Sequence, residues 1–180
     1  MTLREMKDRV LSLIEEINPE SEYLTDDPDI QEKINYCIDM KQHELARIKK
    51  IAATDSFSVS EGDELDLYEE YSDFYKLKNI TGARYDLFEN IVKFNEDGDV
   101  TIKYFKYPKL ITKTTPDTYK MEVSRDCLEI MPYGVAADLL KSDVSAQYGQ
   151  VYERAYQSAL QMLDINASEG SYEIKNGINV

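Results

Sequence analysis

The first group of side chains that could do chemistry is an acidic run from Asp55 to Asp73, in which no basic residue interrupts the carboxylates. Hydrolases use paired carboxylates as general acid and base when their pKa values are pushed apart. Glu69, Glu70 and Asp73 would be the candidates for such a pair. The run lacks the Asp-x-Asp-x-Asp-Gly spacing of a calcium loop. It therefore favours a solvated acidic edge over a metal or catalytic site.

The sulfur and imidazole side chains offer little more. Cys37 and Cys127 are the only cysteines, and each stands in an apolar pattern, which predicts two buried free thiols rather than a disulfide. His43 is the only histidine, and no patterned nucleophile accompanies it. These residues are too few for a zinc site of the usual Cys/His kind. We therefore expect no catalytic residue, no metal, no cofactor and no enzymatic activity.

Lysines and aromatic residues alternate after residue 102. The cluster consists of Lys103, Lys106, Lys109 and Lys113, with Tyr104, Phe105 and Tyr107 among them. Basic and aromatic side chains together are typical of single-stranded nucleic-acid binding. A net charge of −14 opposes binding to a polyanion. The cluster therefore predicts a surface that meets an acidic neighbour or another copy of the chain, with its three aromatic residues as interface candidates.

Two helices are expected at the start of the chain. Thr2 and Glu5 have the spacing of a capping box, and the helix that they open should run to about Ile17. Asp27 and Pro28 form a second strong helix start. An apolar stripe extends that helix to about residue 53, and its members are Ile30, Ile34, Cys37, Ile38, Leu45, Ile48 and Ile51.

Helical periods return after residue 124. Ser124 should cap a short helix over 125–130, and Pro132 suits the first turn of a new helix. A later stripe at spacings of three and four predicts a helix whose apolar face is buried as core. This stripe consists of Tyr148, Val151, Tyr152, Ala155, Ala159, Met162 and Leu163.

Between these helices the hydrophobic period changes to that of strands. Alternation at Phe57, Val59, Leu65 and Leu67 predicts β structure, and further strands are expected over 74–80, 90–95, 100–107 and 119–123. Residues 96–99 have the composition of a hairpin turn, with Gly98 at a position that takes positive φ. Exposed edges of this sheet could pair with another chain.

These elements predict an α+β fold, in which the N- and C-terminal helices form a helical bundle with an inserted antiparallel β subdomain. The expected division is 1–54 for the first bundle helices, 55–123 for the β subdomain, 124–166 for the helices that complete the bundle, and 167–180 for a tail. The tail is polar with strand-like apolar positions, so we expect it to be disordered or to pair with a sheet edge of this or another subunit. Its interface candidates are Tyr172, Ile174 and Ile178.

Composition limits the function classes. The chain has 180 residues, of which 42% are hydrophobic and 31% are charged, as in a water-soluble domain with a real core. No run of apolar residues suits a membrane span or a signal peptide. The 14 tyrosines, without any tryptophan, supply amphipathic anchors of the kind enriched at protein interfaces.

Three motifs together resemble the head-to-tail adaptor (connector) proteins of tailed bacteriophages and prophages. They are Leu24-Thr25-Asp26-Asp27-Pro28-Asp29-Ile30 opening a long helix, Tyr104-Phe105-Lys106-Tyr107-Pro108 followed by Ile111-Thr112, and Met131-Pro132-Tyr133-Gly134-Val135-Ala136-Ala137-Asp138 followed by Asp143 and the stretch Tyr148 to Tyr156. The likeness covers most of the chain in element order. Its motifs are compositional rather than chemical.

The resemblance implies a structural protein of the virion neck, made in the host cytoplasm, that assembles as a homo-oligomeric ring, often a dodecamer, between portal and tail. Its partners would be other copies of itself, the portal protein and downstream neck or tail proteins, with DNA only passing through the lumen and no membrane contact. The β part is larger than in the smallest all-helical adaptors, which leaves open whether the chain meets the portal or sits lower in the neck. The alternative is a small cytoplasmic protein-interaction module unrelated to virions.

Overall fold

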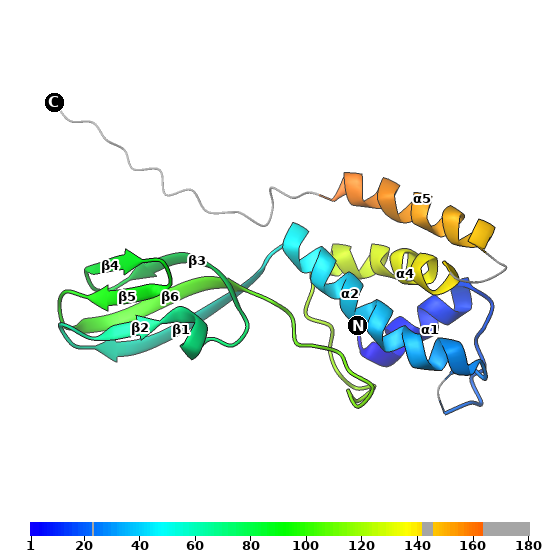
Figure 1. Cartoon of the computed structure of the whole chain (residues 1–180), viewed down its shortest axis with the longest axis horizontal. Helices are drawn as coiled ribbons and strands as arrows, with labels where there is room; N and C mark the ends of the chain where they lie inside the picture. The colour runs from blue at the N-terminus through cyan, green and yellow to red at the C-terminus, as the bar shows by residue number, and fades with distance from the viewer. Residues whose placement is uncertain (23, 142–145, 164–180) are drawn as a thin grey trace.

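The structure, a computed structural model, describes residues 1–22, 24–141 and 146–163 and has a mixed α+β fold. Helices gather at one end of an elongated molecule and strands at the other (Figure 1). The helices are α1 Leu3–Leu13, α2 Pro28–Ile48, α3 Leu67–Glu70, α4 Arg125–Leu140 and α5 Ala146–Met162. The strands are β1 Ile51–Val59, β2 Glu64–Asp66, β3 Phe74–Thr81, β4 Tyr85–Phe88, β5 Ile91–Phe94 and β6 Gly98–Lys106.

The first two helices begin where the capping patterns predict. The Thr2 hydroxyl accepts from the Glu5 N–H at 3.2 Å, and a Glu5 carboxylate oxygen accepts from the Thr2 N–H at 2.8 Å. Asp27 caps α2 by accepting from the N–H groups of Asp29 and Ile30, and Pro28 occupies the first turn. Both local signals act within one turn of the chain, so they are readable without tertiary information.

The end of α2 differs from its predicted position near residue 53. The helix stops at Ile48, and the next residues enter β1, where Ile51 and Thr54 pair with Lys106 and Lys103 of β6. Ile51 fits the apolar stripe of a helix and also fits a β-strand, and its hydrogen-bonded pairing with β6 places it in the strand. The predicted end of α1 at Ile17 is likewise too late, because α1 ends at Leu13.

One continuous helix, α4, replaces the two helices predicted around Pro132. Pro132 lies inside α4, buried, so it removes one intrahelical N–H donor without ending the helix. Ser124 stands at the N-cap, but its side chain makes no capping hydrogen bond. Met131 and Val135 are fully buried on either side of Pro132, so packing compensates for the missing backbone bond.

Helix α4 lies at the centre of the helical part. It contacts α1, α2 and α5, and residues from all four helices share one hydrophobic core. The fully buried side chains of this core include Leu3, Met6, Val10, Leu11, Ile38, Leu45, Cys127, Met131, Val135 and Tyr156. We call this set, with its partly buried neighbours, the helical core.

The buried face of α5 is not the predicted one. Tyr156, outside the predicted stripe, is fully buried, whereas Tyr148, Val151 and Met162 are exposed. Gly149 explains the orientation: a Cβ there would lie 3.3 Å from Leu140 Cβ, so the absence of a side chain lets α5 approach α4 closely. The prediction that this stripe is core is therefore wrong for Tyr148, Val151 and Met162, whereas Leu163 is partly buried against the helical core.

The segment between β6 and α4 runs along α2. Asn35 Nδ2 donates to the Thr112 carbonyl at 2.8 Å, and Gln42 Nε2 donates to the Lys109 carbonyl at 3.3 Å. These hydrogen bonds explain why both polar side chains are buried on α2. The predicted strand over 119–123 is reduced to a single antiparallel bridge, between Thr2 and Lys120.

The strand part consists of two three-stranded antiparallel sheets, in the orders β1-β6-β3 and β2-β5-β4. Side chains from both sheets form a second core, the strand core, which includes Val92, Phe94, Val100 and Ile102. The predicted strands over 74–80, 90–95 and 100–107 are confirmed in type. Leu67 belongs to α3 instead of a strand, and β4 was not predicted.

The turn over 96–99 does not form the predicted hairpin, because β5 and β6 belong to different sheets. Positive φ is found at Gly82, with a value of 108°, and not at Gly98. Gly98 is required for a different reason: a Cβ at this position would lie 2.8 Å from the Gly82 carbonyl oxygen. Close backbone approach, rather than turn conformation, is therefore what selects glycine there.

Candidate interaction surfaces

The predicted carboxylate candidates are surface groups of the strand part. Glu69 and Glu70 are exposed on α3, and Asp73 lies 3.5 Å from Lys106 Nζ and 3.5 Å from the Tyr104 hydroxyl. Three surface hollows of about 540 to 600 Å³ occur on the helical part, and these three carboxylates line none of them. Their surroundings are those of surface groups that make ordinary polar contacts.

The other reactive groups are buried. Cys37 and Cys127 are free, as predicted, and burial raises the pKa of Cys37 to about 11, so its thiol is protonated at neutral pH. His43 Nδ1 lies 3.0 Å from the Asp39 carbonyl oxygen, and its ring stacks on Tyr107. Within the described ranges, no group of three or more His, Cys, Asp or Glu side chains is arranged to hold a metal ion.

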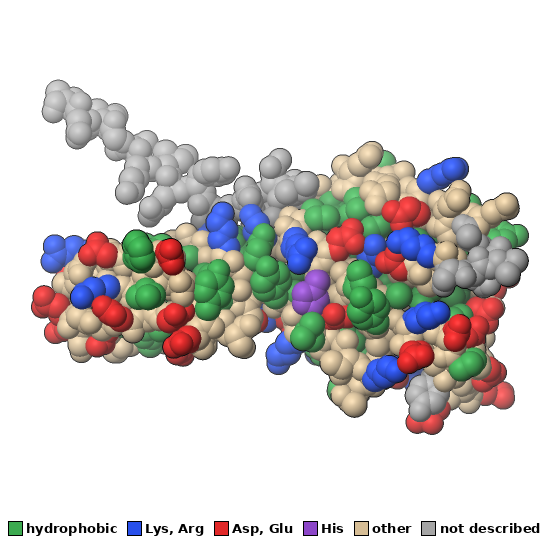
Figure 2. All heavy atoms as spheres, viewed as in Figure 1, with side chains coloured by type: hydrophobic (Ala, Val, Ile, Leu, Met, Phe, Trp, Pro, Cys, Tyr) green, Lys and Arg blue, Asp and Glu red, His purple; other side chains and the backbone are tan. Residues whose placement is uncertain are grey.

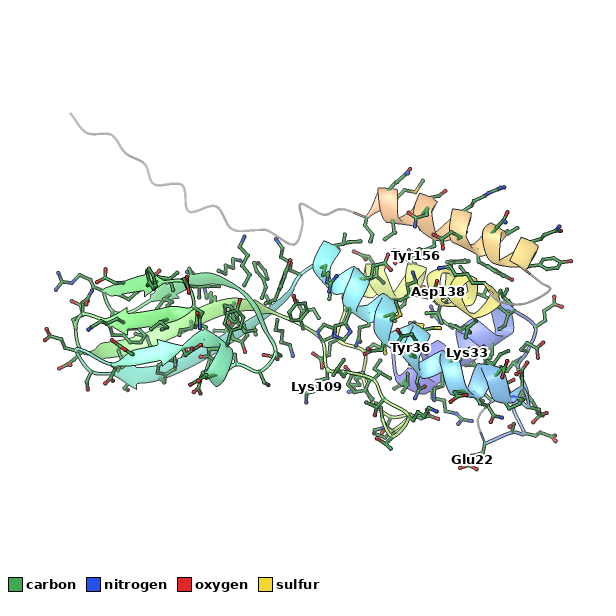
Figure 3. The ribbon with its side chains drawn as sticks, in the orientation of Figure 1. Glu22, Lys33, Tyr36, Lys109, Asp138 and Tyr156 are labelled. Carbon is green, nitrogen blue, oxygen red and sulfur yellow. The ribbon has the colours of Figure 1, made fainter. Side chains whose placement is uncertain are left out.

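A charged cluster ties α2, α4 and α5 together. Lys41 Nζ lies 2.9 Å from a Glu44 oxygen and 3.1 Å from an Asp138 oxygen, and the Tyr156 hydroxyl donates to Glu44 at 3.1 Å. Figure 3 shows Asp138 and Tyr156 close together between their helices. Burial alone would lower the pKa of Lys41, but Glu44 and Asp138 outweigh it and raise the pKa. Lys41 is thus held as a cation, which suits a structural tie and not a general base.

The predicted lysine cluster is dispersed in three dimensions. Lys106 lies 2.7 Å from a Glu122 oxygen, and Lys113 lies 2.8 Å from a Glu32 oxygen. Lys109 is exposed in the segment that follows β6, whereas Lys103 stands on the outer face of the first sheet. The four lysines are close in sequence but do not form one basic surface, because the chain leaves the sheet after Lys106.

Two of the aromatic interface candidates are packed within the chain. Tyr104 is 7% exposed and its ring lies 4.5 Å from that of Tyr71, and Phe105 is also 7% exposed. Tyr107 is half-buried, 4.9 Å from the Tyr75 ring. Because Tyr104 and Phe105 offer little surface, contacts with another chain would depend on other residues. Tyr172, Ile174 and Ile178 lie outside the described residues.

Large apolar side chains are instead exposed in three places that we name here. The junction patch is Tyr36, Met40 and Leu110, the α5 stripe is Tyr148, Val151 and Met162, and the strand pair is Phe88 and Ile91. Phe88 is 75% exposed and Leu110 is 71% exposed. Figure 2 shows hydrophobic side chains beside the single histidine, where the helical and strand parts meet. Surface apolar groups gathered in this way are typical of interaction sites.

Part of the junction patch could have been found from the sequence. Tyr36 and Met40 are four residues apart, on the side of α2 opposite Ile34, Ile38 and Leu45. A second apolar spacing on one helix is a signal for a second contact surface. Leu110 could not be added to it, since its position depends on Ile111, whose N–H donates to Asp39 at 2.7 Å.

Among the described residues, no helix is both long and apolar enough to cross a bilayer. Comparison with known families gives no matching family model. No curated protein matches the sequence either. The likeness to phage head-to-tail adaptors therefore stays a prediction from the motifs quoted above.

Proposed function

We propose that this chain is a structural protein of a phage or prophage virion, a head-to-tail adaptor of the neck that assembles as a ring between portal and tail. In this proposal α1, α2, α4 and α5 act as a helical bundle that docks, and the strand part projects from it as an insertion. Its partners are other copies of itself, the portal protein and downstream neck or tail proteins.

The observation that carries the proposal is the exposure of large apolar side chains on three separate surfaces. The junction patch, the α5 stripe and the strand pair belong to different elements, so one partner on one face would not cover them all. A ring subunit needs two different lateral surfaces for its neighbours and further surfaces for the layers above and below. The number and separation of the patches fit that demand.

The sheet edges support the same proposal. In the orders β1-β6-β3 and β2-β5-β4, every sheet has two outer strands. Strand β1 spans Ile51–Val59, and within the part of the chain that the structure describes it pairs on one side, with β6. A sheet edge of this length without a strand beside it is a template for pairing with another chain. Assembly would cover such edges in the mature particle.

The charge of the chain suits a channel wall. A net charge of −14 repels the phosphate backbone, so DNA would pass a ring lumen without strong binding. The alternative, an interaction module unrelated to virions, uses the same apolar surfaces. It differs in requiring no ring and no portal, and this difference allows a direct test.

The test is sedimentation of the purified chain with the portal protein of the same genome. We expect a complex larger than either component, and loss of that complex or of the ring in a Tyr36→Ser/Met40→Ser variant, whose substitutions remove exposed apolar area and leave the helical core intact. Tyr68→Ser is the matched control, because Tyr68 is also exposed but lies on α3, outside the junction patch. A monomer that never associates with itself, the portal or another neck protein would contradict the proposal.

A further inference from the structure

The two outer faces of the strand part differ in charge. Residues that alternate along a strand point to opposite faces, and directly paired residues share a face. The strand core is therefore lined by one face of each sheet, and no helix or strand within residues 1–22, 24–141 and 146–163 covers the other face of each sheet. These open faces lie on opposite sides of the strand part, because the core is between them.

The open face of the first sheet is basic. On β6 it carries Asp99, Thr101, Lys103 and Phe105, and the β3 residues paired with them include Lys76. Lys78 belongs to the same face, since its Nζ lies over the Phe105 ring, 5.8 Å from the centroid. The β1 partners on this face are Ala52, Thr54, Ser56 and Ser58; Ser56 bonds to Thr101, and the Ser58 hydroxyl donates to Asp99, so three lysines stand against one carboxylate.

The lysines of this face are not matched within the chain. Lys76, Lys78 and Lys103 are all exposed, and none forms an ion pair with a carboxylate in the part of the chain that the structure describes. Other lysines behave differently: Lys41, Lys49 and Lys106 each lie within 3.1 Å of a carboxylate oxygen. In a chain with 35 acidic residues, three lysines without carboxylate partners on one face call for a partner from outside.

The open face of the second sheet has the complementary character. The strand register places Glu64, Asp66, Asp86, Phe88, Ile91 and Lys93 on it. Lys93 is matched by Glu64 at 3.4 Å, so Asp66 and Asp86 leave the face acidic. Phe88 and Ile91, directly paired, form the exposed strand pair at its end.

We propose that the lysine face of one copy docks on the acidic face of the next copy, so that the strand parts form the lateral contact of the ring. This inference rests on the proposed function for its ring. The two faces are different and lie on opposite sides of the strand part, which is the arrangement of a heterologous, head-to-tail interface. The acidic face supplies carboxylates for the lysines and an apolar anchor, Phe88, for the interface centre.

A polynucleotide is the less favoured occupant of the lysine face. Bases stack on exposed aromatic rings, but Phe105, the aromatic residue of this face, is 7% exposed beneath Lys50 and Lys78. The face thus lacks a stacking platform and offers lysines with hydroxyl residues between them. A protein surface with spaced carboxylates fits this pattern better.

Paired charge reversal tests the contact. The first variant carries Lys78→Glu and Lys103→Glu, and the second carries Glu64→Lys and Asp86→Lys. We expect each variant alone to weaken self-association about tenfold or more, equivalent to about 1.4 kcal/mol. An equimolar mixture should restore assembly, because in an alternating ring every reversed face meets a reversed face and every native face meets a native one. Sedimentation velocity over a concentration series measures the self-association of the first variant, of the second variant and of their equimolar mixture.

The controls separate the possible failures. Lys33→Glu with Arg125→Glu makes the same change in net charge on the helical part, outside the junction patch and the α5 stripe, and should leave self-association unchanged. If the wild type assembles and both reversal variants assemble equally well, or if mixing restores nothing, this inference is wrong and the proposed ring stands. If the wild type neither self-associates nor binds the portal, the proposed function fails with it. Binding of a DNA duplex that only the lysine variant loses, with unchanged self-association, would assign the face to nucleic acid instead.

Discussion

The helical part and the strand part bury their residues in different ways. The helical core contains large side chains with no exposure at all, and its charged side chains, such as Lys41, are matched inside the chain. The strand core is smaller, and both sheets leave one face and their edge strands open. The helical part thus matches its buried charge internally while exposing the junction patch and the α5 stripe, whereas the strand part exposes one face of each sheet.

This difference shows which side chains are available for contacts with other molecules. Burial raises the pKa of the Cys37 thiol to about 11 and that of the Tyr119 hydroxyl to about 12, so these groups are inert near neutral pH. The exposed groups include the apolar side chains of the three patches and the lysines of the first sheet, which are suited to contacts with another chain, as the proposed role in assembly requires.

The largest expected effect is on the helical core. Met131→Ala should lower the free energy of unfolding by about 2–5 kcal/mol, because a fully buried side chain is replaced by a cavity. If the two cores are energetically separate, amide hydrogen exchange should accelerate in α4 and remain slow in β6. Met162→Ala, at a side chain that is 85% exposed, is the control and should change stability by less than about 0.5 kcal/mol. Equal acceleration in both parts would show that they unfold together.

The next effect concerns the charged cluster. Lys41→Met should cost about 1–3 kcal/mol, because the mostly buried Asp138 loses its buried cation and is left paired with the exposed Lys141. Lys113→Met is the matched control: its ion pair with Glu32 is exposed on both sides and should contribute less than about 1 kcal/mol. Urea unfolding of both variants gives the comparison. Similar losses would mean that burial does not strengthen the cluster.

A smaller effect is expected at the junction between the parts. Burial alone would raise the pKa of Glu122, but Lys106 on β6 and the Tyr119 hydroxyl outweigh it and lower the pKa below 4.5. A lowered folded-state pKa adds stability above the unfolded-state value and loses it as the pH falls through the folded-state value. Glu122→Gln should therefore cost about 1 kcal/mol at pH 7.

The same substitution should matter less in acid. Below the lowered pKa the wild-type carboxyl is itself protonated, so the stability difference between wild type and Glu122→Gln should shrink when unfolding is measured from pH 7 down to pH 3. A constant difference across that range would show that the charge of Glu122 does not support the junction.

The smallest effect on stability is expected on the α5 stripe. Val151→Ser should change the free energy of unfolding by less than about 0.5 kcal/mol, because this side chain is exposed. Tyr156→Phe, on the buried face of the same helix, removes the hydrogen bond to Glu44 and should cost about 1 kcal/mol. Thermal unfolding of the pair checks which face of α5 is packed. A larger loss of stability in Val151→Ser than in Tyr156→Phe would show that the α5 stripe, and not the face of Tyr156, is packed in the core.

Sequence reasoning succeeded where the deciding interaction is local. The caps at Thr2 and Asp27, the mixed fold class and the free cysteines follow from a few neighbouring residues. It failed where distant partners decide: β6 draws Ile51 into a strand, and packing carries α4 through Pro132.

The candidate surfaces were the least predictable feature. Tyr104 was an interface candidate because it lies among lysines and other aromatic residues in the sequence. In the structure its side chain is buried in the strand core, where Tyr71 and Phe74 pack against it. The lysine face combines β3 with β6, and bulges in β3 shift its register. Lys78 therefore joins Lys103 only once the sheet is formed.

The central claim is that this chain works as a repeated building block. Electron microscopy of the purified protein mixed with the portal protein of the same genome tests it most directly. We predict a ring of copies seated against the portal, with the strand parts in lateral contact. Portal particles that carry no added ring, beside a chain that remains monomeric at every concentration tried, would contradict the claim.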